Sequence, residues 1–228
     1  MTNNDIKYFY HCRKLGLLNE PMLEVGSARV QEHMPNLCQL AKDSGLLQTV
    51  GVDVQPGPGV DVICDFAQTS EAFVSSWGDR TFPTVAIFNV LEHTFDPINV
   101  LRNALHCVSD SGFLLAVVPV VWPLHDYPKD YVRLMPHWFE TFAQQFELAI
   151  VPEAFCWLSP FGMMLTRDVQ RAEQHRLPTF LDVGRTQAPL RYWRSRIVHR
   201  LFNTFGRSHW FSHAALGVAF ARRNHLTA

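Results

Sequence analysis

The chain has 228 residues, a length that fits one domain with a modest elaboration better than two full domains. Hydrophobic residues make up 47% of the sequence and charged residues 18%, which is typical of a packed globular protein and excludes a disordered or fibrous one. The formal net charge is -1 at pH 7, so the overall charge implies no electrostatic partner.

The cysteines and the hydropathy pattern bear on the location of the protein. The five cysteines are far apart and show no CxxC or Cys/His spacing, which indicates free thiols in a reducing cytoplasm and no metal site. The first residues contain no basic segment followed by an apolar stretch. The longest apolar run, 113–121, is about half as long as a membrane span. We therefore expect a cytoplasmic protein.

Short apolar runs alternate with segments of helical spacing along most of the chain. Runs that are apolar throughout are typical of a parallel sheet covered on both faces. The expected strands are 22–26, 49–54, 60–64, 83–88, 113–120, 146–152 and 214–223. The expected helices are 4–18, 33–44, 70–77, 97–108 and 136–145. The pattern predicts a Rossmann-like α/β fold with a doubly wound, mostly parallel sheet of seven strands.

Acidic residues stand at the ends of the first three expected strands. Glu24 lies two residues before Gly26, Asp53 lies near the end of the second strand, and Asp65 directly follows the third. In an open parallel sheet, ligands bind at such strand ends. A carboxylate after the second strand can accept both hydroxyls of a ribose, and a glycine at the first turn lets the backbone approach the ligand. An acid after the third strand can accept from an adenine amino group, with Phe66 beside it to cover the ring.

Five segments carry a resemblance to a known family: LEVGSARV (23–30), VGVDV (50–54), ICDF (63–66), FNVLEHTFDP (88–97) and HDYPKDYVRLMPHWFETF (125–142). The first four are similar, in order and spacing, to the motifs of class I S-adenosylmethionine-dependent methyltransferases, most closely those of the type 11 branch. The last resembles a segment found in a subset of that branch. The resemblance covers about residues 20–150 and implies S-adenosylmethionine as cofactor and methyl transfer as activity.

The resemblance also implies a set of cofactor contacts at the strand ends. These are Glu24, Gly26, Ser27, Ala28, Asp53, Val54, Asp65, Phe66 and Asn89. The sequence departs from the family's E/D-x-G-x-G-x-G loop, because Ala28 and Val30 replace the second and third glycines. The cofactor has no diphosphate to cradle, so this departure bears on affinity and not on the fold. Asn89, after the fourth strand, either lines the sulfonium side of the cofactor or caps the turn.

Two histidines stand where a general base is expected. Methyl transfer is an in-line displacement, so positioning supplies much of the catalysis, and a base helps when the acceptor is a hydroxyl. His125 follows the fifth strand on the side where an acceptor should enter, and His93 closes the NVLEH segment after the fourth. His93 either acts as a base or hydrogen-bonds the next loop and shapes the cofactor site.

The loop around His125 holds the candidate substrate contacts, which are Tyr127, Tyr131 and Arg133. These side chains, with Asp130, either order the loop among themselves or bind the acceptor. An Arg133–Asp130 pair fits both interpretations.

The composition changes after Pro152. We predict a single domain, 1–228, in which residues 159–212 form a helical insertion before the last strand; this segment holds nine arginines against three acids. Part of it, 189–202, has an apolar helical face made of Leu190, Trp193, Ile197 and Leu201. The insertion is either a lid packed over the acceptor pocket or a contact for an anionic acceptor or a membrane surface.

The sequence does not identify the methyl acceptor. We expect O-methylation of a small molecule or a saccharide in glycan or natural-product tailoring, and the arginines suit a phosphorylated or lipid-linked acceptor or a peripheral membrane contact. Nucleic acid is disfavoured because no recognised nucleic-acid module accompanies the arginines. The alternatives are a non-catalytic S-adenosylmethionine-binding or scaffold protein and an RNA-modifying methyltransferase.

Overall fold

The chain is described by a computed structural model that covers residues 2–29, 34–122, 125, 129–159, 162–167, 190, 193, 197 and 214–223. Its helices are α1 (Asn3–Lys14), α2 (Leu37–Asp43), α3 (Ser70–Trp77), α4 (Pro97–His106) and α5 (Pro136–Gln145), with 3₁₀ turns η1 (Leu91–His93) and η2 (Pro152–Ala154). Its strands are β1 (Met22–Val25), β2 (Thr49–Asp53), β3 (Val62–Ile63), β4 (Phe82–Phe88), β5 (Val108–Val121), β6 (Leu148–Ile150), β7 (Cys156–Ser159), β8 (Gly162–Leu165) and β9 (Ala214–Arg222).

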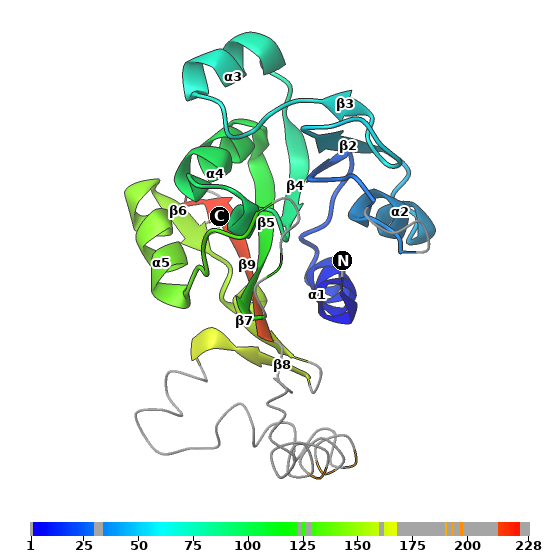
Figure 1. Cartoon of the computed structure of the whole chain (residues 1–228), viewed down its shortest axis with the longest axis vertical. Coiled ribbons are helices and arrows are strands. Elements are labelled where there is room, and N and C mark those ends of the chain that lie inside the picture. Colours follow the sequence, from blue (N-terminus) through cyan, green and yellow to red (C-terminus); the bar gives the residue numbers. More distant parts are fainter. Residues whose placement is uncertain are drawn as a thin grey trace.

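These strands form one twisted sheet, which Figure 1 shows from β3 at one edge to β8 at the other. Within the described ranges it has nine strands in the order β3-β2-β1-β4-β5-β9-β7-β8, and β6 also pairs with β9. The strands from β3 to β5 are parallel, and β9 runs antiparallel to β5. The chain moves outward from β1 to β3 and then returns to place β4 on the other side of β1. This reversal is the switch point at which doubly wound sheets bind ligands.

Each face of the sheet has its own apolar core, which confirms the expected α/β architecture. Leu23 and Val85 belong to the core covered by α3, α4 and α5, whereas Met22 and Ala86 belong to the core covered by α1 and α2. The alternation follows from strand geometry, since successive side chains point to opposite faces. The central strands are therefore buried on both faces, as their uninterrupted apolar runs predict.

The far end of the sheet differs from the expected layout. An antiparallel hairpin of β7 and β8 lies at the start of the expected insertion, and β7 pairs with β9 at Cys156 and Gly217. Most of 159–212, including most of its expected lid helix 189–202, lies outside the described residues. Leu190, Trp193 and Ile197 are described as helical with exposed side chains. Across the residues covered here, no helix is long and apolar enough to cross a bilayer.

Helix α2 begins at Leu37 and not at residue 33, because Asn36 forms its N-cap. The Asn36 side chain accepts the N–H of Gln39 at 2.9 Å and donates to the carbonyl of Ser27 at 3.0 Å. The cap therefore ends the loop that follows β1 and ties its two described ends together.

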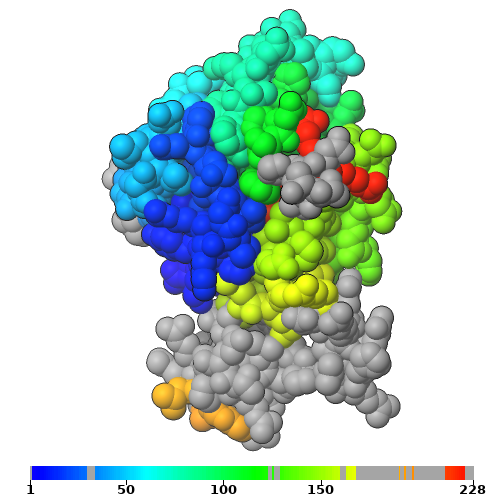
Figure 2. All heavy atoms as spheres, turned by 180° about the vertical axis from the view of Figure 1, so that it is seen from behind, coloured from blue at the N-terminus to red at the C-terminus, as the bar shows by residue number. Residues whose placement is uncertain are grey.

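Helix α1 packs against the end of the sheet that carries η2 and β7. The Tyr8 hydroxyl donates to the Ala154 carbonyl at 2.7 Å, and His11 contacts the Glu153 carbonyl at 2.7 Å. Figure 2 shows the blue N-terminal residues against the yellow-green segment around β7. Gly217 of β9 lies directly under the Tyr8 ring, where an added Cβ would be 2.5 Å from the nearest ring carbon.

We predict that Gly217→Ala lowers the free energy of unfolding by about 1–3 kcal/mol, because the methyl group forces the buried Tyr8 ring out of place. Urea denaturation followed by circular dichroism measures the effect. The control is Gly57→Ala, where the nearest atom to an added Cβ lies 3.9 Å away and a change within about 0.5 kcal/mol is expected. Equal denaturation midpoints for the two variants would contradict the prediction.

Candidate functional site

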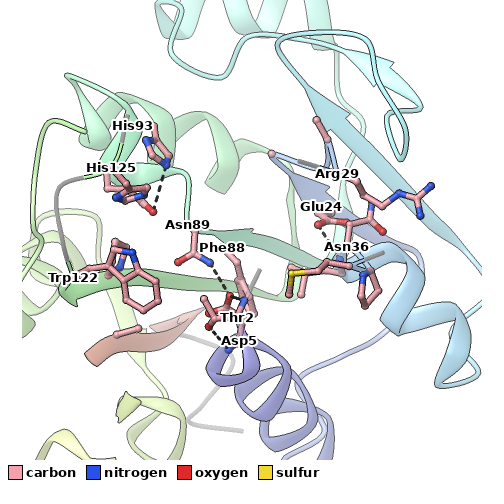
Figure 3. Close-up of a pocket in the computed structure, with 18 residues that line it drawn as sticks. Thr2, Asp5, Glu24, Arg29, Asn36, Phe88, Asn89, His93, Trp122 and His125 are labelled. Atoms are coloured by element: carbon pink, nitrogen blue, oxygen red, sulfur yellow. Dashed lines mark hydrogen bonds and ion pairs between the residues drawn. The ribbon is translucent and has the colours of Figure 1, made fainter. Parts of the chain in front are cut away.

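A cavity of about 380 Å³ opens at the switch point, at the carboxyl ends of β1 and β4. Its walls come from the loops after β1, β4 and β5, from α1 and from the start of α2. Figure 3 shows Glu24, Arg29 and Asn36 at one end of the cavity and His93 and His125 at the other. Asn89 lies between the two groups, so one cavity brings together the predicted cofactor loop and the predicted base.

Gly26 ends β1 in a conformation that no other residue fits. Its φ is +80°, and an added Cβ would lie 2.3 Å from Cγ2 of Val90. The N–H groups of Gly26 and Ser27 both donate to the carbonyl of Val52, at 2.8 and 3.0 Å. The loop after β1 is therefore pressed against the loop after β4, and glycine is required for both its backbone angle and its size.

Glu24 lies on the cavity wall, but its carboxylate is engaged by α2. Its two oxygens accept the N–H groups of Leu37 and Cys38 at 2.9 and 2.8 Å. The side chain is buried, and this burial raises the pKa of Glu24 to about 7 against the two hydrogen bonds, which lower it. Direct contact of Glu24 with a cofactor stays a prediction.

Asp53 is not among the residues that line the cavity, but it contacts Ala28, which does line it. Asp53 accepts the N–H of Ala28 at 3.0 Å on one oxygen and the N–H of Gln55 at 3.3 Å on the other. Each carboxylate oxygen keeps a further lone pair for a ligand hydroxyl. Val54, next along the chain, is exposed, whereas Ser27 is fully buried.

The expectation that Phe66 covers an adenine ring is wrong in this structure. Phe66 is 3% exposed, and its ring packs edge-on against Phe73 and Trp77 in the core. Asn103 fixes the backbone there by donating to the Phe66 carbonyl at 2.9 Å. Asp65 accepts the N–H of Ala67 in a tight turn and does not line the cavity. The Phe66 ring, which the sequence analysis assigned to the adenine, instead packs against the aromatic side chains of α3.

Asn89 is held by α1, which the sequence did not place at the site. Its φ is +55°, its N–H donates to the Val117 carbonyl, and its side chain donates to Asp5 Oδ2 at 2.9 Å. Asp5 is fully buried on the cavity wall, and no hydrogen bond from the described residues reaches its Oδ1. Burial raises the pKa of Asp5. The sequence shows Thr2 and Asp5 only as a capping box, a signal for a helix start and not for a site.

The opposite end of the cavity holds a compact cluster of Glu92, His93 and His125. The His93 and His125 rings lie edge to face with centroids 4.9 Å apart, and His93 Nε2 lies 3.7 Å from Glu92 Oε1. His93 Nδ1 donates to the Lys129 carbonyl at 2.6 Å, so the interpretation that His93 bonds the next loop is confirmed. Partial burial lowers the pKa of His93 and favours its neutral form.

Sequence reasoning missed Glu92, the middle member of this cluster. It is 1% exposed, and neither carboxylate oxygen has a hydrogen-bond partner among the residues that the structure covers. Burial raises the pKa of Glu92 to about 8. The only signal was its place next to His93 in the NVLEH segment, where the family resemblance drew attention to the histidine.

Asp130 orders the loop that carries His125. It pairs with Arg133, as the sequence suggested, and the guanidinium lowers the pKa of Asp130 to about 2. The same carboxylate accepts the His125 N–H at 3.1 Å and lies 3.0 Å from His125 Nδ1. Tyr131 donates its N–H to the Glu92 carbonyl, while its ring is partly exposed beside Phe95. The Arg133–Asp130 pair is therefore present, and both its ordering role and acceptor binding by Arg133 stay predictions.

Tyr127, the remaining candidate for substrate contact, lies outside the described residues. So does Val30, which replaces the third glycine of the family loop.

Because Glu24 is buried, the stability of the protein should depend on pH through its raised pKa. An acid whose pKa is higher in the folded than in the unfolded state stabilises the fold below the unfolded value and loses that contribution as pH rises through the folded value. The contribution of Glu24 should therefore fall by about 3 kcal/mol between pH 4.5 and pH 8. Urea denaturation across this range should show a shallower decline in Glu24→Gln than in the native protein. Parallel curves would contradict the assignment.

No protein-family model and no curated protein matches the sequence. Solved structures match at the level of fold. A proposed methyltransferase from Bacillus halodurans C-125 gives a TM-score of 0.54 at 12% identity, over 94% of this chain and 98% of that one. An S-adenosylmethionine-dependent methyltransferase from Archaeoglobus fulgidus gives a TM-score of 0.51 at 12% identity, over 96% of this chain and 94% of that one. The (4+2)-cyclase SpnF gives a TM-score of 0.52 at 13% identity, over 95% of this chain and 81% of that one. The chain has the class I S-adenosylmethionine-dependent methyltransferase fold.

Proposed function

We propose that the chain is an S-adenosylmethionine-dependent methyltransferase that acts on a hydroxyl of a small molecule or saccharide. The observation that carries this proposal is the single cavity that joins the loop after β1 to the His93 and His125 pair. A cofactor loop at one end and proton-accepting side chains at the other are what transfer to a hydroxyl needs.

The residues present fit such a cofactor. Asp53 follows β2 with a carboxylate that has lone pairs to spare for two ribose hydroxyls. Asp5 presents a buried oxygen without a partner to the cavity, which suits a ligand that carries an ammonium group. Gly26 keeps side-chain atoms away from the turn where the backbone meets the ligand.

The chain's own residues have distinct tasks in this proposal. When bound, the cofactor supplies an electrophilic methyl group on a sulfonium. The loop after β1 holds it at one end of the cavity, with Asp53 behind that loop on the Ala28 N–H, while Trp122 and Pro119 line the other end with apolar surface and keep water out. His125 accepts the proton of the acceptor hydroxyl, and Asp130 keeps its ring in place.

We also propose that the arginine-rich insertion, residues 159–212, selects the acceptor. The cofactor motifs are complete before it begins, and its nine arginines suit a phosphorylated or lipid-linked saccharide. A non-catalytic binder is the second candidate, and the replacement of the second glycine by Ala28 supports it. Turnover of labelled cofactor with a panel of hydroxylated acceptors distinguishes the two, because a binder gives no methylated product.

Asp53→Ala should weaken binding of S-adenosylhomocysteine by about 10- to 100-fold, because charge-assisted hydrogen bonds of roughly 1.5–3 kcal/mol are lost. Isothermal titration calorimetry measures the affinity, and circular dichroism verifies the fold. The matched control is Asp61→Ala, which removes a carboxylate that accepts the Gly51 N–H of β2 at 2.8 Å, whereas Asp53 accepts the Ala28 N–H of the loop after β1. An unchanged affinity in Asp53→Ala would refute its role.

His125→Ala should lower kcat by about 10²- to 10⁴-fold, the usual contribution of a general base, with less than a threefold change in affinity for S-adenosylhomocysteine. The rate is measured at saturating acceptor, with the acceptor that the panel identifies. His137→Ala is the control, since that histidine is on the exposed side of α5. A fall below threefold at saturating acceptor would remove His125 as the base and leave catalysis to positioning.

A further inference from the structure

The cluster of Glu92, His93 and His125 has the composition and spacing of a metal centre. One possible ligand atom from each residue lies within 4.8 Å of the other two. Ligand atoms bound at 2.0–2.2 Å around one ion are roughly 3–3.5 Å apart, so small side-chain rotations bring the three into place. The closest pair, His93 Nε2 and Glu92 Oε1, is already at 3.7 Å.

His93 has the outer hydrogen bond that metal-binding histidines use, and His125 has a carboxylate near its second nitrogen. A ligating imidazole normally directs its second nitrogen to a backbone carbonyl or a carboxylate, which fixes the tautomer and the ring orientation. His93 Nδ1 donates to the Lys129 carbonyl at 2.6 Å, and His125 Nδ1 lies 3.0 Å from Asp130 Oδ2. The His93 ring is thereby held with Nε2 left for an ion, whereas the His125 ring needs a small rotation to align Nδ1 with Asp130.

Glu92 supplies an independent observation that points to a cation. Its side chain is 1% exposed, lines the cavity, and has two oxygens without a hydrogen-bond partner among the described residues. A buried carboxylate without partners is costly, and native structures offset that cost with a partner or an ion. Arg133, the basic side chain of the adjacent loop, is already bound by Asp130.

We propose that Glu92, His93 and His125 bind one divalent first-row transition metal ion, such as Zn²⁺, at the acceptor end of the cavity. Two imidazole nitrogens and one carboxylate form the three-ligand set of catalytic zinc and non-haem iron sites, which keep further positions open. Mg²⁺ and Ca²⁺ prefer sites made of oxygen alone. The sequence pointed away from metals because its cysteines lack metal spacing, whereas these ligands come from two separate loops.

The ion-binding inference does not rest on the proposed methyl transfer, because the three ligands belong to this chain and need neither cofactor nor acceptor. If both proposals hold, a bound ion lowers the pKa of a coordinated hydroxyl and takes over from His125 the task of easing proton loss. Binding of the ion and binding of S-adenosylhomocysteine are measured separately, so failure of one proposal is distinguishable from failure of the other.

The test is a titration of the chelator-treated full chain with Co²⁺, whose visible absorption reports on its ligands. We expect one equivalent to bind with nitrogen–oxygen coordination and to be displaced by Zn²⁺. Absence of stoichiometric binding by the native protein would overturn the proposal. So would the strong near-ultraviolet band of a cobalt–thiolate bond, since it would place the ion on one of the five free cysteines.

Variants locate the ion. Glu92→Gln, which preserves shape, and His125→Ala should each weaken Co²⁺ binding by at least about 10- to 100-fold, and Asp130→Asn should weaken it through loss of the outer partner. His137→Ala is the matched control, because His137 and Glu140 form an exposed His–Glu pair at 3.9 Å. Circular dichroism verifies folding of every variant. Native-like affinity in Glu92→Gln would show that Glu92 does not hold the ion, and would overturn the proposal.

Discussion

The buried carboxylate of Glu24 joins strand β1 to the first turn of α2, and the geometry of the cavity depends on this tie. A carboxylate in the core needs hydrogen-bond donors, and the N–H groups at a helix start need acceptors. Leu37 and Cys38 satisfy both needs at once. Asn36 adds a second tie by donating to the Ser27 carbonyl. These bonds hold the described ends of the loop after β1, which explains how the loop keeps its place with only one of the family's three glycines.

Three buried acids, Asp5, Glu24 and Glu92, line the cavity, and burial raises the pKa of each. Such groups reduce stability, since a hydrophobic side chain of similar size costs nothing to bury. Proteins retain them where ligands use them. A cationic ligand restores the charged form of the acids around it and releases their protons, so cation binding here is coupled to pH. This argument applies equally to a sulfonium, an ammonium group and a metal ion.

The periodicity of the sequence predicted those elements whose position depends on the burial pattern of one continuous segment. The strands from β1 to β5 and the N-cap of α4 at Asp96 lie where apolar runs and capping residues placed them, although β3 is only two residues long. Contacts between distant segments could not be predicted this way. Asp5 meets Asn89 only because α1 docks over the carboxyl end of β4, and Phe66 turns inward because α3 presents Phe73 and Trp77 to it. The β7–β8 hairpin is made of two four-residue strands without long alternation, and it straddles the start of the expected insertion at residue 159.

The two ends of the cavity share one short segment of chain, and this links cofactor binding to the chemistry at the acceptor end. Asn89 ends β4 in the left-handed conformation, and Val90 then presses against Gly26 of the cofactor loop. The single turn η1 follows at once and places Glu92 and His93 at the other end. A ligand that displaces the loop after β1 must therefore move Val90. Val90 is two residues before Glu92 in the chain, so its movement also affects Glu92 and His93. Close packing favours transmission of such shifts, because protein interiors are hard to compress. In the proposed transfer, the same few residues would set the positions of donor and acceptor, as an in-line displacement requires.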